Sequence, residues 1–336
     1  MRLGFGFGLQ YSRLSGGGSG YNAFIIEVKT DNAGTSNDNQ FQFTGAVGDY
    51  DVVAKQNDIV VATFNDLSGQ QTITLPSSGI YYLEITPKST NGFNRIAFDN
   101  GGDKDKIIDI KQWGDVAWSS FESAFNNCDN MLVTATDVPN LSSVTTMSNM
   151  FYFATSANPD TTNWDVSSVT NMSNMFRNAT SANPDTSNWD VSSVTDMFFM
   201  FANASSANPN VTNWDVSSVT TMFAMFFNAS SANPDVLNWD VSSVTTMRSM
   251  FFNASSANPD TSNWDVSSVT TMRSMFENSN LSVENLTACY ENWSQLNLQQ
   301  NVSFGAGNTK YNSSGQAGRD ILVNTYNWII TDGGQV

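Results

Sequence analysis

A fourteen-residue motif returns every 25 residues through the middle of this 336-residue chain. It reads NWDVSSVTNMSNMF at residues 163–176 and returns, with changes at a few positions, at residues 188–201, 213–226, 238–251 and 263–276. Self-similarity at a fixed period is typical of architectures in which one unit cannot bury its apolar side and neighbouring units cover it. The repeat therefore predicts an elongated stack of similar coils.

The repeated apolar residues predict the core of that stack. Trp164 and Val166 stand two residues apart, as residues on one face of a β-strand do. Val169, Met172 and Met175 follow at intervals of three, which places them on one face of a helical or 3₁₀-like turn. We therefore expect each unit to be a short strand, a turn and a short helical or bent segment. Stacked in register, such units would form a parallel sheet with a coil spacing of about 4.8 Å.

Composition divides the chain into four regions, so we expect a multidomain protein. Residues 1–20 are glycine-rich and predict an N-terminal anchor or linker. Residues 21–105 contain six runs of β-branched and aromatic residues separated by turn residues, which predicts an all-β sandwich of the immunoglobulin-like kind. Residues 106–285 hold the repeats. Residues 286–336 carry apolar residues every three or four positions, which predicts an α/β cap of short helices leading into a strand.

Charge and residue types narrow the range of functions. The chain has no histidine, the commonest general base and metal ligand, so we expect no enzymatic activity, no catalytic residues and no bound cofactor. Acidic residues outnumber basic ones 31 to 14 and no basic cluster occurs, which argues against nucleic-acid binding. Cys128 and Cys289 form no CxxC pair, and we expect them to be small buried apolar residues.

The sequence also bears on location. No apolar run approaches the ~20 residues needed to span a bilayer, so membrane insertion is not expected. The first 20 residues lack the apolar stretch of a secretory signal. We therefore expect another route out of the cell, such as assembly on a virus particle followed by lysis of the host.

The motif resembles a known repeat. Units of the form NWDVSSVTxMxxMF are similar to the 26-residue repeat of BspA-like leucine-rich-repeat surface proteins, over about residues 118–285. The stretches that flank the array, NRIAFDNGGDKDKIIDIKQWGDVAW and NLTACYENWSQL, resemble those of phage-encoded members. The resemblance implies a leucine-rich-repeat-type solenoid with parallel strands and short helical turns, and a role in surface attachment. The chain departs from the family in its 25-residue period and in Ala179, where many members have Cys.

Positions that change between copies indicate where function lies. If the Met and Phe columns point inward, the residues between and after them point outward. Several of these are aromatic and flanked by arginines, and contiguous exposed aromatics are typical of contact surfaces. We name this set the aromatic strip; its members are Tyr152, Arg177, Phe198, Phe199, Phe223, Phe227, Arg248, Phe252 and Arg273. Its partner is either a receptor or another part of the same particle, including the N-terminal domain or an identical subunit.

A second repeated surface is acidic. One aspartate per repeat lies between the inward Trp and Val, and these residues are Asp165, Asp190, Asp215, Asp240 and Asp265. Carboxylates stacked at strand spacing repel one another unless they are satisfied. Hydrogen bonds to the backbone at the turn into SSV would satisfy them. Ca²⁺ held between coils and the hydroxyl groups of a glycan are the alternatives.

These observations favour a non-enzymatic adhesion or receptor-binding protein on a phage particle, as a tail fibre or another virion surface protein. Its N-terminus would dock to other virion structural proteins, and a face of the solenoid would bind a host-surface glycan or protein. We expect it at the virion surface, with the bacterial cell surface as the alternative. Further alternatives are a virion decoration or spacer without receptor binding, a bacterial cell-surface adhesin, self-association into a homo-oligomer, and an ice-binding threonine column.

Overall fold

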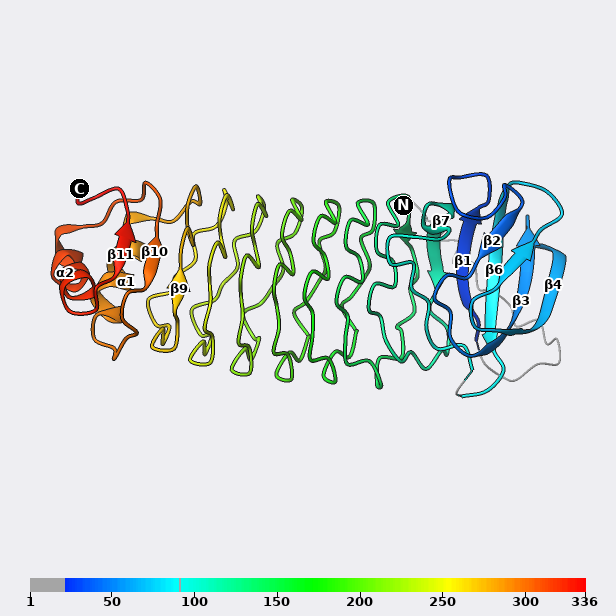
Figure 1. The fold of residues 1–336 in the computed structure, drawn as a ribbon, viewed down its shortest axis with the longest axis horizontal. Coiled ribbons are helices and arrows are strands. Elements are labelled where there is room, and N and C mark those ends of the chain that lie inside the picture. The colour runs from blue at the N-terminus through cyan, green and yellow to red at the C-terminus, as the bar shows by residue number, and fades with distance from the viewer. Residues whose placement is uncertain (1–21, 91) are drawn as a thin grey trace, which may run out of the picture.

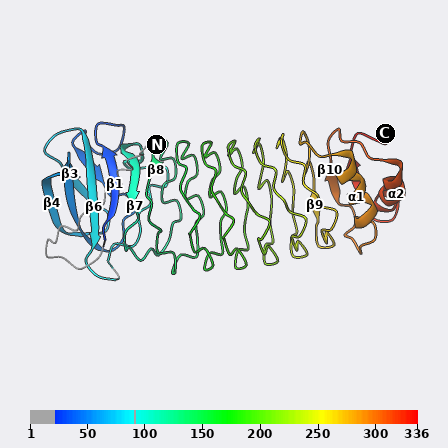
Figure 2. The same cartoon turned by 180° about the vertical axis from the view of Figure 1, so that it is seen from behind.

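The computed structural model describes residues 22–90 and 92–336. Figure 1 shows an elongated molecule with a β-sheet region at one end, a row of stacked coils in the middle and a small cap at the other end. Figure 2 shows the same order from behind. Among the described residues the fold is mostly β with few helices; the strands form three sheets, none of which closes into a barrel.

The N-terminal region is built on a six-stranded sheet with the order β4–β3–β6–β1–β7–β8. Neighbouring strands from β4 to β7 are antiparallel, whereas β7 and β8 are parallel. Its strands are β1 (Phe24–Lys29), β3 (Asp49–Gln56), β4 (Ile59–Ser68), β6 (Ile80–Pro87), β7 (Ile107–Gln112) and β8 (Leu132–Val133). A separate antiparallel pair joins β2 (Gln40–Gln42) to β5 (Thr72–Thr74).

Alternating burial explains these strands. Every second residue of β1, β3 and β6 is buried, including Ile26, Val52 and Leu83, so each strand turns one apolar face to the core. Phe43, just after β2, packs against Tyr50 of β3 with ring centroids 5.4 Å apart. The six strand-forming runs predicted within residues 21–105 are confirmed as β1 to β6.

The N-terminal sheet continues past residue 105, where the sequence places the next domain. After the 3₁₀ helix η1 (Lys104–Lys106), β7 pairs with β1 on one side and with β8 of the first coil on the other. A buried ion pair holds η1 against the connection between β1 and β2, with the Lys106 ammonium 3.8 Å from a carboxylate oxygen of Asp103. Lys106 also donates to the carbonyls of Ser36 and Asn37. Sheet and coils therefore share one hydrogen-bonded framework.

Parallel bridges at a single position join successive coils. The bridged residue is the first after VT in each motif, and the series runs through Thr146, Asn171, Asp196, Thr221, Thr246 and Thr271. It ends in β9 (Thr271–Met272), which pairs in parallel with β10 (Ser303–Gly305) of the cap. The 25-residue period is therefore the number of residues in one coil.

The strand predicted at NWDV is wrong. Trp and Val of this segment are buried as predicted, but its backbone is an irregular stretch between two turns. The N–H of Trp189 donates to the carbonyl of Thr186 three residues earlier, at 3.1 Å. Asp190 accepts the N–H of Ser192 at 3.0 Å. These local bonds occupy backbone groups that a strand would pair with its neighbour, so the ladder between coils forms after VT instead.

The MxxMF segment is a series of turns closed by bonds between residues three apart, such as that from the N–H of Met175 to the carbonyl of Met172 at 3.2 Å. Of the predicted alternatives, the bent segment is confirmed and the helical one is wrong. Alternate N–H groups donate to the next coil: that of Met172 to the carbonyl of Asp196 at 3.0 Å, and that of Asn174 to the carbonyl of Phe198 at 2.8 Å. Asn174 and Asn178 have φ angles of 55° and 60°, in the left-handed region that asparagine tolerates. The alternation lets one segment close its own turn and bind the neighbouring coil.

Columns of identical side chains form the core of the array, as predicted. The five Trp residues of the motifs are at most 4% exposed. The Trp214 and Trp239 rings stack with centroids 6.2 Å apart, and those of Phe201 and Phe226 with centroids 5.6 Å apart. The indole N–H of Trp239 donates to the carbonyl of Val211 in the preceding coil at 3.1 Å. Each coil therefore covers the next with the same contacts.

The C-terminal cap extends these columns. Helix α1 (Val283–Trp293) begins after Ser282, whose hydroxyl accepts a backbone N–H as an N-cap. Trp293 donates to the carbonyl of Thr261 at 3.1 Å, and Phe304 packs edge-on against Phe276. The remaining elements are η2 (Ser313–Gly315), α2 (Gln316–Asn324) and β11 (Ile329–Thr331). The predicted helices leading into a strand are confirmed.

Candidate binding surface

The aromatic strip lies on the corner of the coils that the MxxMF segments form. Its aromatic members and Arg177 are half-buried, while Arg248 and Arg273 are exposed. The side chains therefore face away from the core, as predicted, although neighbouring strip residues partly cover them. The ring contacts of the strip all join residues 152–252 of the coil array, and Figure 1 shows the N-terminal sheet at one end of that array.

The rings of the strip form a continuous network across coils. Phe198 lies with its ring centroid 4.5 Å from Phe199 and 5.1 Å from Phe223. Phe199 is 6.4 Å from Phe227, which stacks on Phe252 at 5.0 Å. Because these contacts link neighbouring coils, the strip is one surface.

Arginines lie over ring faces of this network. The Arg177 guanidinium is 4.2 Å from the ring centroid of Phe199 and 5.5 Å from that of Tyr152. Arg248 is 5.6 Å from the centroid of Phe223. These are cation–π distances. Among the described residues the strip arginines form no ion pair, so no carboxylate of the protein neutralises them.

The placement of basic residues singles out this corner. Arg177, Arg248 and Arg273 are the only Lys or Arg residues between positions 118 and 285. Two acidic residues lie at the same corner: Asp196, two residues before Phe198, and Glu277, at the position that Arg177 holds in an earlier repeat. Three arginines against two carboxylates leave this corner slightly positive. The turn at NWDV carries an aspartate in each of its five copies. The strip is therefore the positive surface of an acidic array.

Two aromatic residues adopt a backbone conformation that suits smaller residues. Phe199 has a φ of 54°, where the next repeats carry Ala224 and Ser249. Phe153, which sequence reasoning missed, has a φ of 57° where the next repeat carries Asn178. It is 38% exposed and adjoins the strip; its departure from the repeated asparagine is the signal that could have revealed it. The same left-handed angle recurs at these positions in the other coils, so it belongs to the coil and not to the phenylalanines. A bulky residue in this conformation is an outlier, which favours a contact role for the two rings.

The acidic column forms Asx turns, so the predicted turn-capping role is confirmed. Each aspartate accepts the N–H of the serine two residues later, and Asp215 also accepts the hydroxyl of Ser217 at 2.6 Å. The serine hydroxyl and then its amide lower the pKa of Asp165, Asp215 and Asp240 below the ordinary value. In the described ranges no three His, Cys, Asp or Glu residues are grouped to hold a metal, so the calcium alternative gains no support.

The threonine column also has a structural role. The Thr195 hydroxyl donates to the carbonyl of Thr170 in the preceding coil at 3.2 Å, and the bond recurs at Thr220, Thr245 and Thr270. These hydroxyl protons point at the neighbouring coil instead of at solvent, which weakens the ice-binding alternative.

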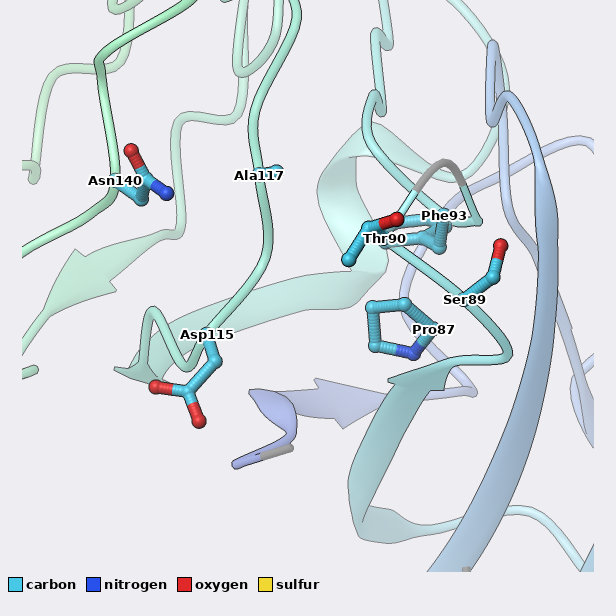
Figure 3. Close-up of a pocket in the computed structure, with 7 residues that line it drawn as sticks. All are labelled: Pro87, Ser89, Thr90, Phe93, Asp115, Ala117 and Asn140. Atoms are coloured by element: carbon cyan, nitrogen blue, oxygen red, sulfur yellow. The ribbon is translucent and has the colours of Figure 1, made fainter. Parts of the chain in front are cut away.

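Two surface hollows lie near the ends of the array. One, of about 160 Å³, lies where the N-terminal sheet meets the first coils and is smaller than the ~300–1,000 Å³ of typical ligand pockets. Figure 3 shows its lining: Pro87, Ser89, Thr90, Phe93, Asp115, Ala117 and Asn140. The Asp115 carboxylate accepts the N–H of Asn22 at 2.8 Å and is therefore engaged. The other, of about 320 Å³, is lined by Asn278, Ser279, Asn308 and Thr309.

Helices in the described part of the chain are too short or too polar to cross a bilayer. No curated protein and no solved structure matched the chain. The family described as "Mycoplasma protein of unknown function, DUF285" matches residues 119–234 and again residues 205–315. Together these segments take in the coil array and the first part of the cap, more than half of the chain. On the strength of that match, the chain belongs to the DUF285 family.

Proposed function

We propose that the protein is a non-enzymatic adhesion or receptor-binding protein whose coil array presents the aromatic strip to a partner on another surface. The observation that carries this proposal is the strip itself, in which half-buried rings and unpaired arginines gather on one corner of an acidic array. Aromatic and arginine side chains are enriched at contact surfaces and dominate their binding energy.

We infer that the array is a leucine-rich-repeat-type solenoid of the BspA-like kind, and that the N-terminal region is immunoglobulin-like. A parallel bridge at each 25-residue step and different structures at the two ends support the solenoid. The six-stranded sheet and the separate pair β2–β5 support a sandwich.

For the setting, we propose the surface of a phage particle, as in a tail fibre, with residues 1–20 docking to other virion proteins. Those residues lie outside the described part of the chain. A bacterial cell surface is the second candidate, because the name of the matched family refers to Mycoplasma. In both settings the strip would contact a molecule on the opposing surface.

The test compares attachment of purified protein to a panel of bacterial strains by flow cytometry. The variant combines Phe198→Ser, Phe199→Asn and Phe223→Ser, because Ser173 and Asn174 stand at these positions in an earlier repeat. The new residues therefore fit the coil, and circular dichroism checks the fold. We expect the parent chain to bind at least one strain and the variant to lose about tenfold or more of that binding.

Leu237→Ser is the matched control. Leu237 is a half-buried apolar residue on another corner, and Ser187 and Ser262 stand at its position in other repeats. This variant should attach as the parent does. Equal attachment of the strip variant, or no attachment of the parent to any strain, would contradict the proposal and favour a decoration or spacer role.

A further inference from the structure

Four rings of the strip, those of Phe198, Phe223, Phe227 and Phe252, stack in pairs along the axis of the array and so turn their edges outward. Phe198 stacks on Phe223 with an interplanar angle of 18°, and Phe227 stacks on Phe252 at 6°. Arg248, one coil further on, lies over the remaining side of Phe223. Since stacked partners stand on successive coils, the planes of these four rings lie across the axis and their edges turn outward. Phe199 is the exception, because its ring is inclined at 87° to Phe198 and at 69° to Phe223.

Edges and faces of an aromatic ring attract different partners. The face carries partial negative charge and the edge partial positive charge. A sugar ring that stacks on an aromatic platform needs a free face that points outward. An arginine lies over the ring of Phe199, and the ring of Phe223 is covered by both Arg248 and Phe198. The outward edges instead suit apolar side chains and the oxygen atoms of carboxylates.

The charges of the strip also favour a partner that carries carboxylates. Arg248 and Arg273 occupy equivalent positions on adjacent coils, are both exposed and form no ion pair within the described residues. Adjacent guanidinium groups bind carboxylates through charge-assisted hydrogen bonds. Because the rest of the array is acidic, an anionic partner is attracted to this corner and repelled elsewhere.

A second copy of the chain does not meet these requirements. Two strips paired antiparallel about Phe199 and Phe223, where the rings are densest, would bring Arg177 of one copy beside Arg248 of the other. Parallel pairing would place each arginine beside its own equivalent. Both arrangements oppose like charges, which disfavours association.

We propose that the aromatic strip binds an acidic protein segment that also carries apolar side chains. This rests on the proposed function and names the chemical class of its partner. The carboxylates of the segment would pair with Arg248 and Arg273, and its apolar side chains would pack on the ring edges of Phe198, Phe223 and Phe252.

The experiment selects displayed random 12-residue peptides on the immobilised full-length protein, with the strip variant used to remove other binders. Enriched peptides are synthesised and their dissociation constants measured by isothermal titration at low and high salt. Polygalacturonate and cellohexaose, an acidic and a neutral glycan, are measured alongside. We expect enriched peptides to combine Asp or Glu with apolar residues and to bind more weakly as salt rises.

Charge reversal identifies the contact. Arg273→Glu should weaken peptide binding about tenfold or more, whereas Lys310→Glu, an exposed site in the cap with the same change of charge, should leave it unchanged. Four results would each overturn the proposal. The selection could yield neutral or basic peptides or no peptide at all, both charge-reversal variants could lose the same amount of binding, or a glycan could bind the strip where peptides do not. If cell attachment still required the strip, the strip would be the binding surface as proposed, and only the proposed class of partner would be wrong.

Discussion

Two buried tryptophans at equivalent positions differ in one hydrogen bond. The indole N–H of Trp239 donates to the carbonyl of Val211 at 3.1 Å, but that of Trp164 finds no protein acceptor in the described residues. Both side chains are at most 3% exposed. Trp164→Phe and Trp239→Phe therefore remove the same atoms. Trp239 stacks between Trp214 and Trp264, whereas Trp164 packs edge-on against Trp113, so Trp214→Phe is the comparison with matching ring contacts.

The expected difference follows from the free energy of that bond. Removing the Trp239 donor loses a hydrogen bond that contributes about 1 kcal/mol, in addition to the lost ring volume. Removing the Trp164 donor loses the same volume but relieves an unpaired buried N–H, which costs about 1–3 kcal/mol. We expect Trp239→Phe to reduce the free energy of unfolding by about 2–4 kcal/mol more than Trp164→Phe does.

Guanidinium unfolding followed by far-UV circular dichroism measures this difference. The slope of unfolding free energy against denaturant must agree among the proteins compared, because repeat arrays can unfold in segments. Trp214→Phe, which removes an equivalent bond to Thr186, should match Trp239→Phe. A loss at Trp164 as large as at the other two positions would refute the reasoning.

Three further predictions concern stability and reactivity. Lys106→Met removes the cation that pairs with the buried Asp103 carboxylate, which keeps its hydrogen bonds from Thr35, Ser36 and Gln42, and it also removes the donor to the Ser36 and Asn37 carbonyls. It should cost about 3–5 kcal/mol of unfolding free energy, whereas Lys310→Met should change it by under about 0.5 kcal/mol. Equal losses in calorimetry would contradict this. The pKa of Asp215 is lowered in the folded state, so its contribution is present above the unfolded pKa of about 4 and lost as the pH falls through the folded pKa. Asp215→Asn keeps an oxygen acceptor for the turn, so thermal melts should agree with the parent at pH 7 and show a smaller loss below about pH 4; an unchanged acid response would contradict this. Burial raises the pKa of the Cys289 thiol to about 12 and that of Cys128 well above its ordinary value. A disulfide reagent at pH 8 should therefore label neither cysteine in the folded protein and both cysteines in guanidinium. Labelling of the folded protein would contradict this prediction.

Much of the array could be predicted from the chain because each coil meets the same environment. A position that must face the core in one repeat must do so in the next, so repetition itself marks Trp189, Met197 and Phe201 as buried. The NWDV segment shows the limit of this reasoning. Residues two apart share a side in a strand and also in this irregular segment, so burial of Trp and Val fits both.

The candidate binding surface was also predictable only in part. Variation between copies identified the outward positions from the sequence, including Phe198 and Arg248, but not how they are arranged. The exposure of a ring edge or a ring face depends on what the neighbouring coil places above it. Sequence spacing within one repeat carries no information about that contact.

The sequence by itself determined the period of the coil, the residues that fill its core and the corner on which variation gathers. Only the tertiary structure decided where the ladder between coils runs, that Phe199 and Phe153 stand at left-handed backbone positions of the coil, and over which rings Arg177 and Arg248 lie. The physical reason is that core burial repeats within each unit, whereas these features depend on contacts between residues about 25 positions apart, whose geometry is set by stacking.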